Sequence, residues 1–174
     1  MTTDGHVALA ARVLGALSLL AVGVIHLHEY QELYSAIPTI GTLFVLSFIG
    51  ALVVSAGLLS PVDRLPGRWG DLAVVGLALA GIGQATTQFV FLAISEQRPL
   101  FGFQEPGYDP PAILASRIAE VATVAFLAAF LITRATRRRA SHGPGQRQPH
   151  NSTPPGTAHE TTIRATHLHT ERST

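Results

Sequence analysis

The sequence predicts an all-α fold, a four-helix transmembrane bundle with a disordered C-terminal tail. Hydrophobic residues make up 47% of the chain and charged residues only 13%, whereas soluble domains carry about 25% charge. Mean hydropathy is +0.33 although the end of the chain is polar, so the apolar residues are concentrated before it. They form four runs, each close to the length of about 20 residues that crosses a bilayer, at residues 7–29, 37–59, 72–95 and 111–134.

The segments between these runs have the composition of loops. Six or seven residues separate the first two runs, so the two helices should be antiparallel neighbours, and Pro38 suits the first turn of the second. Residues 60–71 combine Pro, Gly and charge with an interfacial Trp69. The longest connection, 95–111, contains three aromatic residues that predict an ordered lid at the membrane surface, Phe101, Phe103 and Tyr108.

The two ends of the chain differ from the runs. Residues 1–6 are a short polar lead, and residues 140–174 are rich in Pro, Gly, Ser, Thr and His. Such a tail cannot bury enough surface to fold alone. Its histidines leave a metal-binding tail as the less favoured alternative to disorder, because their spacings are irregular and only His167 and His169 are close. The first run has a rival interpretation as a secretory signal. We expect it to be retained as a helix, because it continues into HLHEY without a small-x-small cleavage site.

Composition and motifs exclude several classes of function. The absence of Cys rules out disulfides, thiolate metal sites and a Cys nucleophile. The net charge of +1 is too balanced to indicate nucleic-acid binding. The sequence contains no G-x-S-x-G, Walker or GxGxxG loop, so an enzyme is not indicated. All twelve basic residues are Arg, which we interpret as GC-rich codon usage.

The arginines predict the orientation. They cluster near the start of the first run, in the joint at 60–71 and after the last run, whereas the joint at 30–36 has none and that at 95–111 only Arg98. The positive-inside rule therefore places both termini and the joint at 60–71 in the cytoplasm, and the joints at 30–36 and 95–111 outside, with the protein in the plasma membrane. RATRRRA, at 134–140, should end the last helix.

Polar residues of several helices then fall in the outer half of the bilayer. Ionisable groups at that depth are costly and tend to mark function. The candidate ligand-binding residues are His26, Glu29, Tyr30, Gln84, Gln88, Arg117 and Glu120. Only one of His26 and His28 can face the bundle interior, because residues two apart lie about 200° apart around a helix. We expect this to be His26, which shares a face with Glu29.

Each of these residues also has a purely structural interpretation. Gln84 and Gln88 continue a stripe with Gly76 and Ala80 that should point into protein, where the amides could be either interhelical glue or ligand contacts. Arg117 and Glu120 are spaced to form an ion pair on one helix face. A divalent metal on His26, Glu29 and Glu120 is a further hypothesis, as is a proton relay. Bis-histidine haem would need a homo-oligomer, because both histidines lie on one helix.

Two stretches carry a resemblance to known proteins. GVIHLHEYQELYSAIPTIGTLFVLSFIGALV and LFGFQEPGYDPPAILASRIAEV resemble a group of small four-helix integral membrane proteins of high-GC bacteria. In that group a His ends helix one, IPxIGxLF opens helix two and an LFGFxE loop precedes a Glu-bearing last helix. The resemblance implies the fold and the placement of His26, Tyr34 and Glu120, but no reaction. It also implies that the membrane is a bacterial inner membrane. A looser similarity to DoxX-like proteins rests on topology alone.

Three functions follow as hypotheses. The first is a binding or transport-accessory protein whose outer-half pocket receives a small ligand or metal ion. The second is a structural or assembly subunit whose Arg-rich segment and tail contact a cytoplasmic partner or anionic lipid. The third is a membrane redox subunit.

Overall fold

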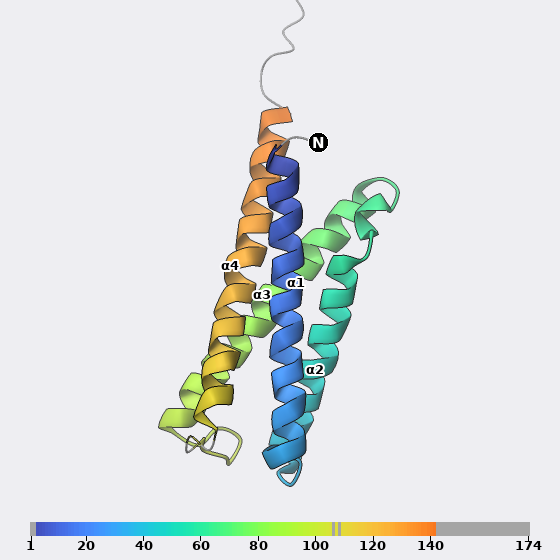
Figure 1. Ribbon diagram of the computed structural model, residues 1–174. Helices are drawn as coiled ribbons and strands as arrows, with labels where there is room; N and C mark the ends of the chain where they lie inside the picture. The colour runs from blue at the N-terminus through green and yellow to red at the C-terminus, as the bar shows by residue number, and fades with distance from the viewer. Residues whose placement is uncertain (1–2, 106, 108, 142–174) are drawn as a thin grey trace, which may run out of the picture. The chain divides into compact units, whose positions relative to one another are not determined.

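The four-helix bundle is confirmed. The computed structural model describes residues 3–105, 107 and 109–141, and the predicted disordered tail lies almost entirely outside them. Figure 1 shows four long helices, α1 (Thr3–Glu29), α2 (Pro38–Leu59), α3 (Arg68–Gln97) and α4 (Pro110–Ser141). A π-helical turn, η1 (Tyr30–Tyr34), continues α1, and a short 3-10 turn, η2 (Val62–Arg64), lies between α2 and α3.

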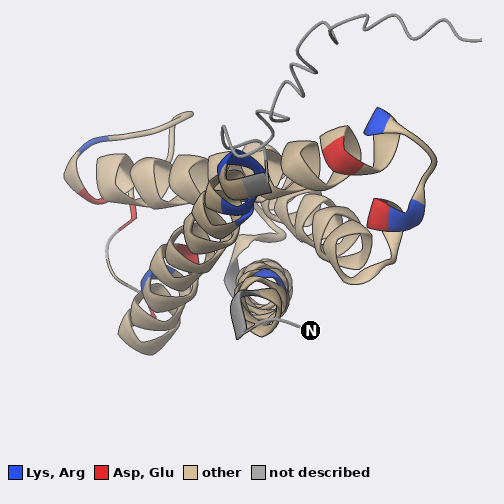
Figure 2. Cartoon of the chain, turned by 90° about the horizontal axis from the view of Figure 1, so that it is seen from above, with Lys and Arg blue, Asp and Glu red and all other residues tan. Residues whose placement is uncertain are grey.

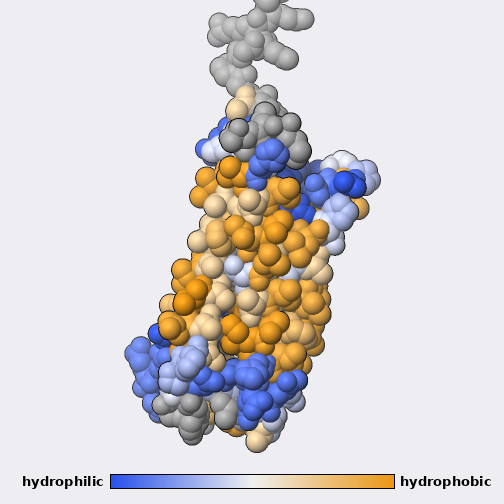
Figure 3. All heavy atoms as spheres, in the orientation of Figure 1, coloured by the Kyte–Doolittle hydropathy of each residue, from blue (hydrophilic) through white to orange (hydrophobic). Residues whose placement is uncertain are grey.

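All four helices are long and apolar enough to cross a membrane. Their outward faces carry large apolar side chains such as Val53, Ile118 and Ile132, each more than 60% exposed. Figure 3 shows this surface as an apolar band with hydrophilic residues at both ends, and Figure 2 shows charged residues mainly at helix ends and in the joints. This is the architecture of a multi-pass membrane protein.

The helices pack in a closed order. α1 packs mainly against α2 and α4, and α3 packs against the same two helices. In Figure 1 α3 is strongly tilted: it begins beside the end of α2 and finishes beside the start of α4. The start of α1 and the end of α4 lie at one end of the bundle, which we call the terminal end. The opposite end, with η1 and the 98–109 loop, is the loop end.

The dense core occupies the half nearer the terminal end. Half of its side chains are alanines, and such small residues let helices approach closely. The core comprises Ala8, Ala11, Ala16, Leu58, Val74, Ala78, Leu127 and Phe130. α1 comes close to α4 at Gly15. A Cβ added there would lie 2.5 Å from a terminal carbon of Leu127. The loop half has no equivalent filling, and the cavity described below lies there.

Polar contacts tie the helices together at the terminal end. The buried Arg12 of α1 reaches the last turn of α2, where its Nε donates to the Leu58 carbonyl at 2.5 Å and its Nη2 to the Ser60 carbonyl at 2.6 Å. Asp71, near the start of α3, pairs with both Arg134 and Arg138 of α4. These contacts hold helix ends that lack intrahelical partners.

The prediction that the segment 134–140 ends the last helix is wrong, because α4 continues to Ser141. Arginine is a good helix former and is favoured near a helix C-terminus by the helix dipole. The ion pairs with Asp71 add a tertiary reason for this segment to stay helical. The start of α4 has an ordinary cap, since the Asp109 carboxylate accepts the Ala112 N–H at 3.0 Å.

Candidate functional site

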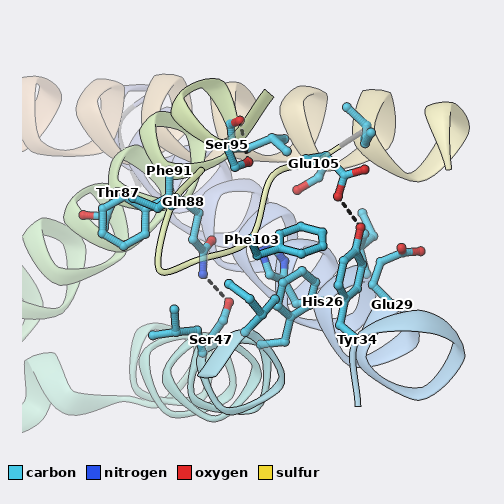
Figure 4. Close-up of a pocket in the computed structure, with 18 of the residues that line it drawn as sticks. His26, Glu29, Tyr34, Ser47, Thr87, Gln88, Phe91, Ser95, Phe103 and Glu105 are labelled. Atoms are coloured by element: carbon cyan, nitrogen blue, oxygen red, sulfur yellow. Dashed lines mark hydrogen bonds between the residues drawn. The ribbon is translucent and has the colours of Figure 1, made fainter. Parts of the chain in front are cut away.

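A cavity of about 400 Å³ lies inside the loop half of the bundle. All four helices, η1 and the 98–109 loop contribute to its wall, which is predominantly apolar. The polar residues on it are His26, Glu29, Tyr34, Ser47, Gln84, Thr87, Gln88, Ser95, Glu105, Ser116 and Glu120. Figure 4 shows Tyr34 and Glu105 on one side of the space and Gln88 and Ser47 on the other, with His26 and Phe103 between them.

Aromatic rings form one side of the cavity. The Tyr34 ring stacks on Phe44 with centroids 4.8 Å apart and meets Phe103 edge-on at 5.5 Å. The His26 ring lies 4.9 Å from Phe44. His26 faces inward as predicted, whereas His28 is exposed. The His26 Nδ1 is 2.8 Å from the Val22 carbonyl. Because a carbonyl only accepts, Nδ1 carries the proton and Nε2 is the acceptor of the neutral ring.

The π-helical turn decides which residues of α1 and η1 reach the cavity. In a π turn, residues five apart lie on the same face, so Glu29 and Tyr34 both line the cavity. Tyr30, a predicted site residue, is not on the cavity wall. Its ring packs over Gly41 of α2, where an added Cβ would lie 3.1 Å from the ring. From the residues alone Tyr34 was not a candidate, because an ordinary α-helical spacing does not place it beside Glu29.

The 98–109 loop covers the cavity. Leu100 and Phe103 exchange backbone hydrogen bonds around a tight turn, in which Phe101 and Gly102 have positive φ of 52° and 81°. The Glu105 N–H donates to the Ser95 carbonyl at 3.0 Å, and its buried carboxylate accepts from the Tyr34 hydroxyl and from the Gly107 N–H. Tyr108, which we expected in this lid, lies outside the described residues, and Phe101 is 56% exposed.

The two glutamines of α3 both turn inward and contact α2. Gln84 Nε2 donates to the Ser47 carbonyl at 2.8 Å, and Gln88 Nε2 donates to the Ser47 hydroxyl. The amides therefore form hydrogen bonds between α3 and α2. The buried Oε1 of Gln88, however, has no hydrogen-bond partner. The other half of the predicted stripe is different, because Gly76 and Ala80 are exposed. The tilt of α3 turns that part of its face outward.

Glu120 of α4 is buried, with 1% of its surface exposed. One carboxylate oxygen accepts from the Ser116 hydroxyl at 3.1 Å, and the other has no hydrogen-bond partner. Glu120 lines the main cavity and also a shallower groove on the outer surface between α3 and α4. It therefore lies in the wall between the cavity and the lipid-facing side of the bundle.

The predicted ion pair between Arg117 and Glu120 is wrong. Arg117 pairs with Glu96 of α3, and its guanidinium lies 5.9 Å from the ring centroid of Phe89. Glu120 points inward while Arg117 is half-exposed, so neighbouring positions on one helix meet different environments. Arg117, a predicted ligand contact, is not on the cavity wall.

The structure does not assemble the predicted metal site. Among the described residues, no three His, Asp or Glu side chains are grouped closely enough to hold a metal ion, so His26, Glu29 and Glu120 do not form such a set. Figure 4 shows Glu29 at the margin of the group, beside Tyr34. Its buried Oε1 has no hydrogen-bond partner. What the structure brings together is a partly open apolar space with a few polar atoms on its wall.

Comparison of the chain with protein-family models, with curated proteins and with solved structures finds no match.

Proposed function

We propose that this protein binds a small, mostly apolar molecule in the cavity of the loop half. The observation that carries the proposal is the combination of a partly open space of about 400 Å³ between the helices with buried oxygens of Glu120 and Gln88 that have no partner. Ligand pockets typically measure about 300–1,000 Å³ and combine apolar walls with a few polar groups that fix orientation. A buried polar atom without a partner costs about 1–3 kcal/mol, and a ligand that bonded these oxygens would remove that cost.

The surroundings favour a ligand that comes from the bilayer. The helices expose apolar residues around the cavity, and Glu120 lies between the cavity and the groove formed by Phe89, Val121 and Val124. That groove is open on the lipid-facing side, since Val121 is 57% exposed. The lipid-facing side of the bundle therefore comes close to the cavity at Glu120, away from the polar ends. Transport-accessory activity, if present, would follow from this binding.

The arginine distribution supports an orientation for this proposal. With the arginine-rich terminal end in the cytoplasm of a bacterium, the cavity lies in the outer half of the inner membrane. The alternative role as an assembly subunit used the arginines after the last run as a contact for a partner or anionic lipid. Two of them, Arg134 and Arg138, already pair with Asp71 of α3 within the chain, which favours the binding role.

Filling the cavity tests the proposal. The Ala112 side chain is on the cavity wall, whereas Ala115 of the same helix is exposed and is not on it. The full chain is reconstituted in nanodiscs, and binding of fluorophenyl-hexanol, a neutral probe with an apolar body, is followed by fluorine NMR against empty nanodiscs. We expect saturable binding that Ala112→Leu weakens about tenfold or more, a loss of about 1.4 kcal/mol or more, and that Ala115→Leu leaves unchanged.

Two results would contradict the proposal: no saturable binding above that of empty nanodiscs, or equal effects of Ala112→Leu and Ala115→Leu. Mass analysis of small molecules that co-purify in mild detergent gives an independent check. We expect the Ala112→Leu protein to retain less of any such molecule than the Ala115→Leu protein.

A further inference from the structure

The polar atoms that remain available on the cavity wall are mainly hydrogen-bond acceptors. The buried oxygens without partners belong to Glu120, Gln88 and, at the margin, Glu29. The neutral His26 ring adds Nε2 as an acceptor, because its Nδ1 donates to the Val22 carbonyl. A molecule that satisfies these atoms has to bring donors of its own.

The donors on the same wall are largely engaged within the protein. Each glutamine amide uses one of its two N–H donors on Ser47. The hydroxyl groups of the wall donate to internal acceptors in four cases, namely Tyr34, Thr87, Ser95 and Ser116. A ligand that mainly accepts hydrogen bonds would therefore find few partners here.

Apart from His26, the ionisable groups on the wall are acids. Three carboxyl side chains line the cavity, Glu29, Glu105 and Glu120, and no Arg or Lys is among the lining residues. Arg117, the basic residue nearest to Glu120 along α4, pairs instead with Glu96. Opposite charges attract strongly in a low-dielectric interior, so this wall favours a cation and disfavours an anion. The aromatic faces of Tyr34, Phe44 and Phe103 are also compatible with a positive charge.

We infer that the cavity selects amphiphilic amines: molecules with an apolar body and a protonated amino group, the amine donating to the free oxygens of Glu120 and Gln88. This inference rests on the proposed function, since it specifies the chemical class of the ligand. An ammonium group offers up to three donors and a positive charge. Hydrogen bonds between charged groups are roughly twice as strong as neutral ones.

Three probes with the same apolar body and different head groups test the inference. They are fluorophenyl-hexylamine, fluorophenyl-hexanol and fluorophenyl-hexanoate, each measured on the full chain in nanodiscs by fluorine NMR, with empty nanodiscs of the same lipid subtracted. We expect the amine to bind about tenfold or more tightly than the alcohol, and the carboxylate to bind more weakly than both. This comparison needs no variant.

Two charge-removing variants then locate the effect. Glu120→Gln keeps the shape of the side chain and an acceptor for Ser116 but removes the carboxylate. We expect it to lose most of the preference for the amine over the alcohol while the affinity for the alcohol changes less than about threefold. Glu96→Gln is the matched control, because Glu96 is outside the cavity wall, and it should leave the preference intact.

The outcomes separate this inference from the proposed function. If the alcohol binds saturably but the amine binds no more tightly, the inference is overturned and the cavity remains a ligand site. If the carboxylate binds as tightly as the amine, the inference is likewise overturned. If none of the three probes binds above empty nanodiscs, both the inference and the proposed function fail.

Discussion

The hydroxyl of Tyr34 donates to the buried carboxylate of Glu105, which joins η1 to the 98–109 loop across 71 positions of the sequence. Glu105 also accepts the Gly107 N–H at 2.8 Å, and its own backbone N–H bonds to Ser95 at the end of α3. Glu105 therefore connects its own loop to η1 through its carboxylate and to α3 through its backbone N–H. The covering loop is held by specific hydrogen bonds as well as by aromatic packing.

Removing the Tyr34 hydroxyl should loosen this cover. Tyr34→Phe keeps the ring contacts with Phe44 and Phe103 but takes one donor from a buried carboxylate, so we expect a loss of about 1–3 kcal/mol in the free energy of unfolding. The measurement is thermal unfolding of the purified chain in detergent. Tyr30→Phe is the control, because the Tyr30 ring packs on Gly41 and its hydroxyl donates to no described residue. Equal unfolding temperatures for the two variants would contradict the assigned role.

The helical architecture follows from the sequence for a simple reason. An apolar run of bilayer length must satisfy its backbone internally and becomes a helix, so composition alone locates four helices. Helical periodicity also predicts correctly that His26 faces inward and His28 outward. The inward direction of Gln84 and Gln88 has the same origin, since an amide facing lipid would lack a partner.

The remaining parts of the site depend on features that no local pattern encodes. Tyr34 reaches the cavity because η1 changes the helical period, whereas the Tyr30 ring packs over Gly41 of α2 and is not on the wall. Arg117 finds its partner in Glu96 on another helix, 21 positions away, rather than in its neighbour Glu120. The direction of a long side chain at a helix surface is set by the neighbouring helix, and the sequence does not give the tilt of α3.

Arg12 provides a second test, at the terminal end. Its guanidinium donates to two carbonyls that end α2 and lies 3.5 Å from Asp63. Arg12→Leu would remove both of these bonds, although the Ser60 carbonyl would keep a second donor, the Val62 N–H. Hydrogen bonds to charged groups contribute about 1.5–3 kcal/mol, and we expect a loss of at least that size in thermal unfolding. The stability of Arg12→Lys should lie between that of the unchanged chain and that of Arg12→Leu. Lysine keeps the charge, but an ammonium lacks the planar fork that reaches both carbonyls.

Arg64 offers the matched control for this effect. Its side chain is exposed and close in sequence to Asp63, so Arg64→Leu removes the same charge from the same end of the bundle. We expect little change in stability. In addition, limited proteolysis between residues 60 and 67 should become faster for Arg12→Leu and stay unchanged for Arg64→Leu. If both variants lost stability equally, the loss would be due to the change in net charge and not to the capping of α2 by Arg12.

The orientation of the bundle can be tested cleanly because the chain contains no cysteine. A single Cys introduced at an exposed position then reports one side of the membrane. Leu65 lies between α2 and α3 near the terminal end, and Gln104 lies in the 98–109 loop; both side chains are exposed. We expect Gln104→Cys to react with a membrane-impermeant maleimide in intact bacterial cells. Leu65→Cys should react only after the cells are permeabilised, because positive residues are retained in the cytoplasm. The reverse labelling pattern would place the cavity in the inner half of the bilayer and overturn the proposed orientation. The proposal of ligand binding would stand, because it rests on the cavity itself.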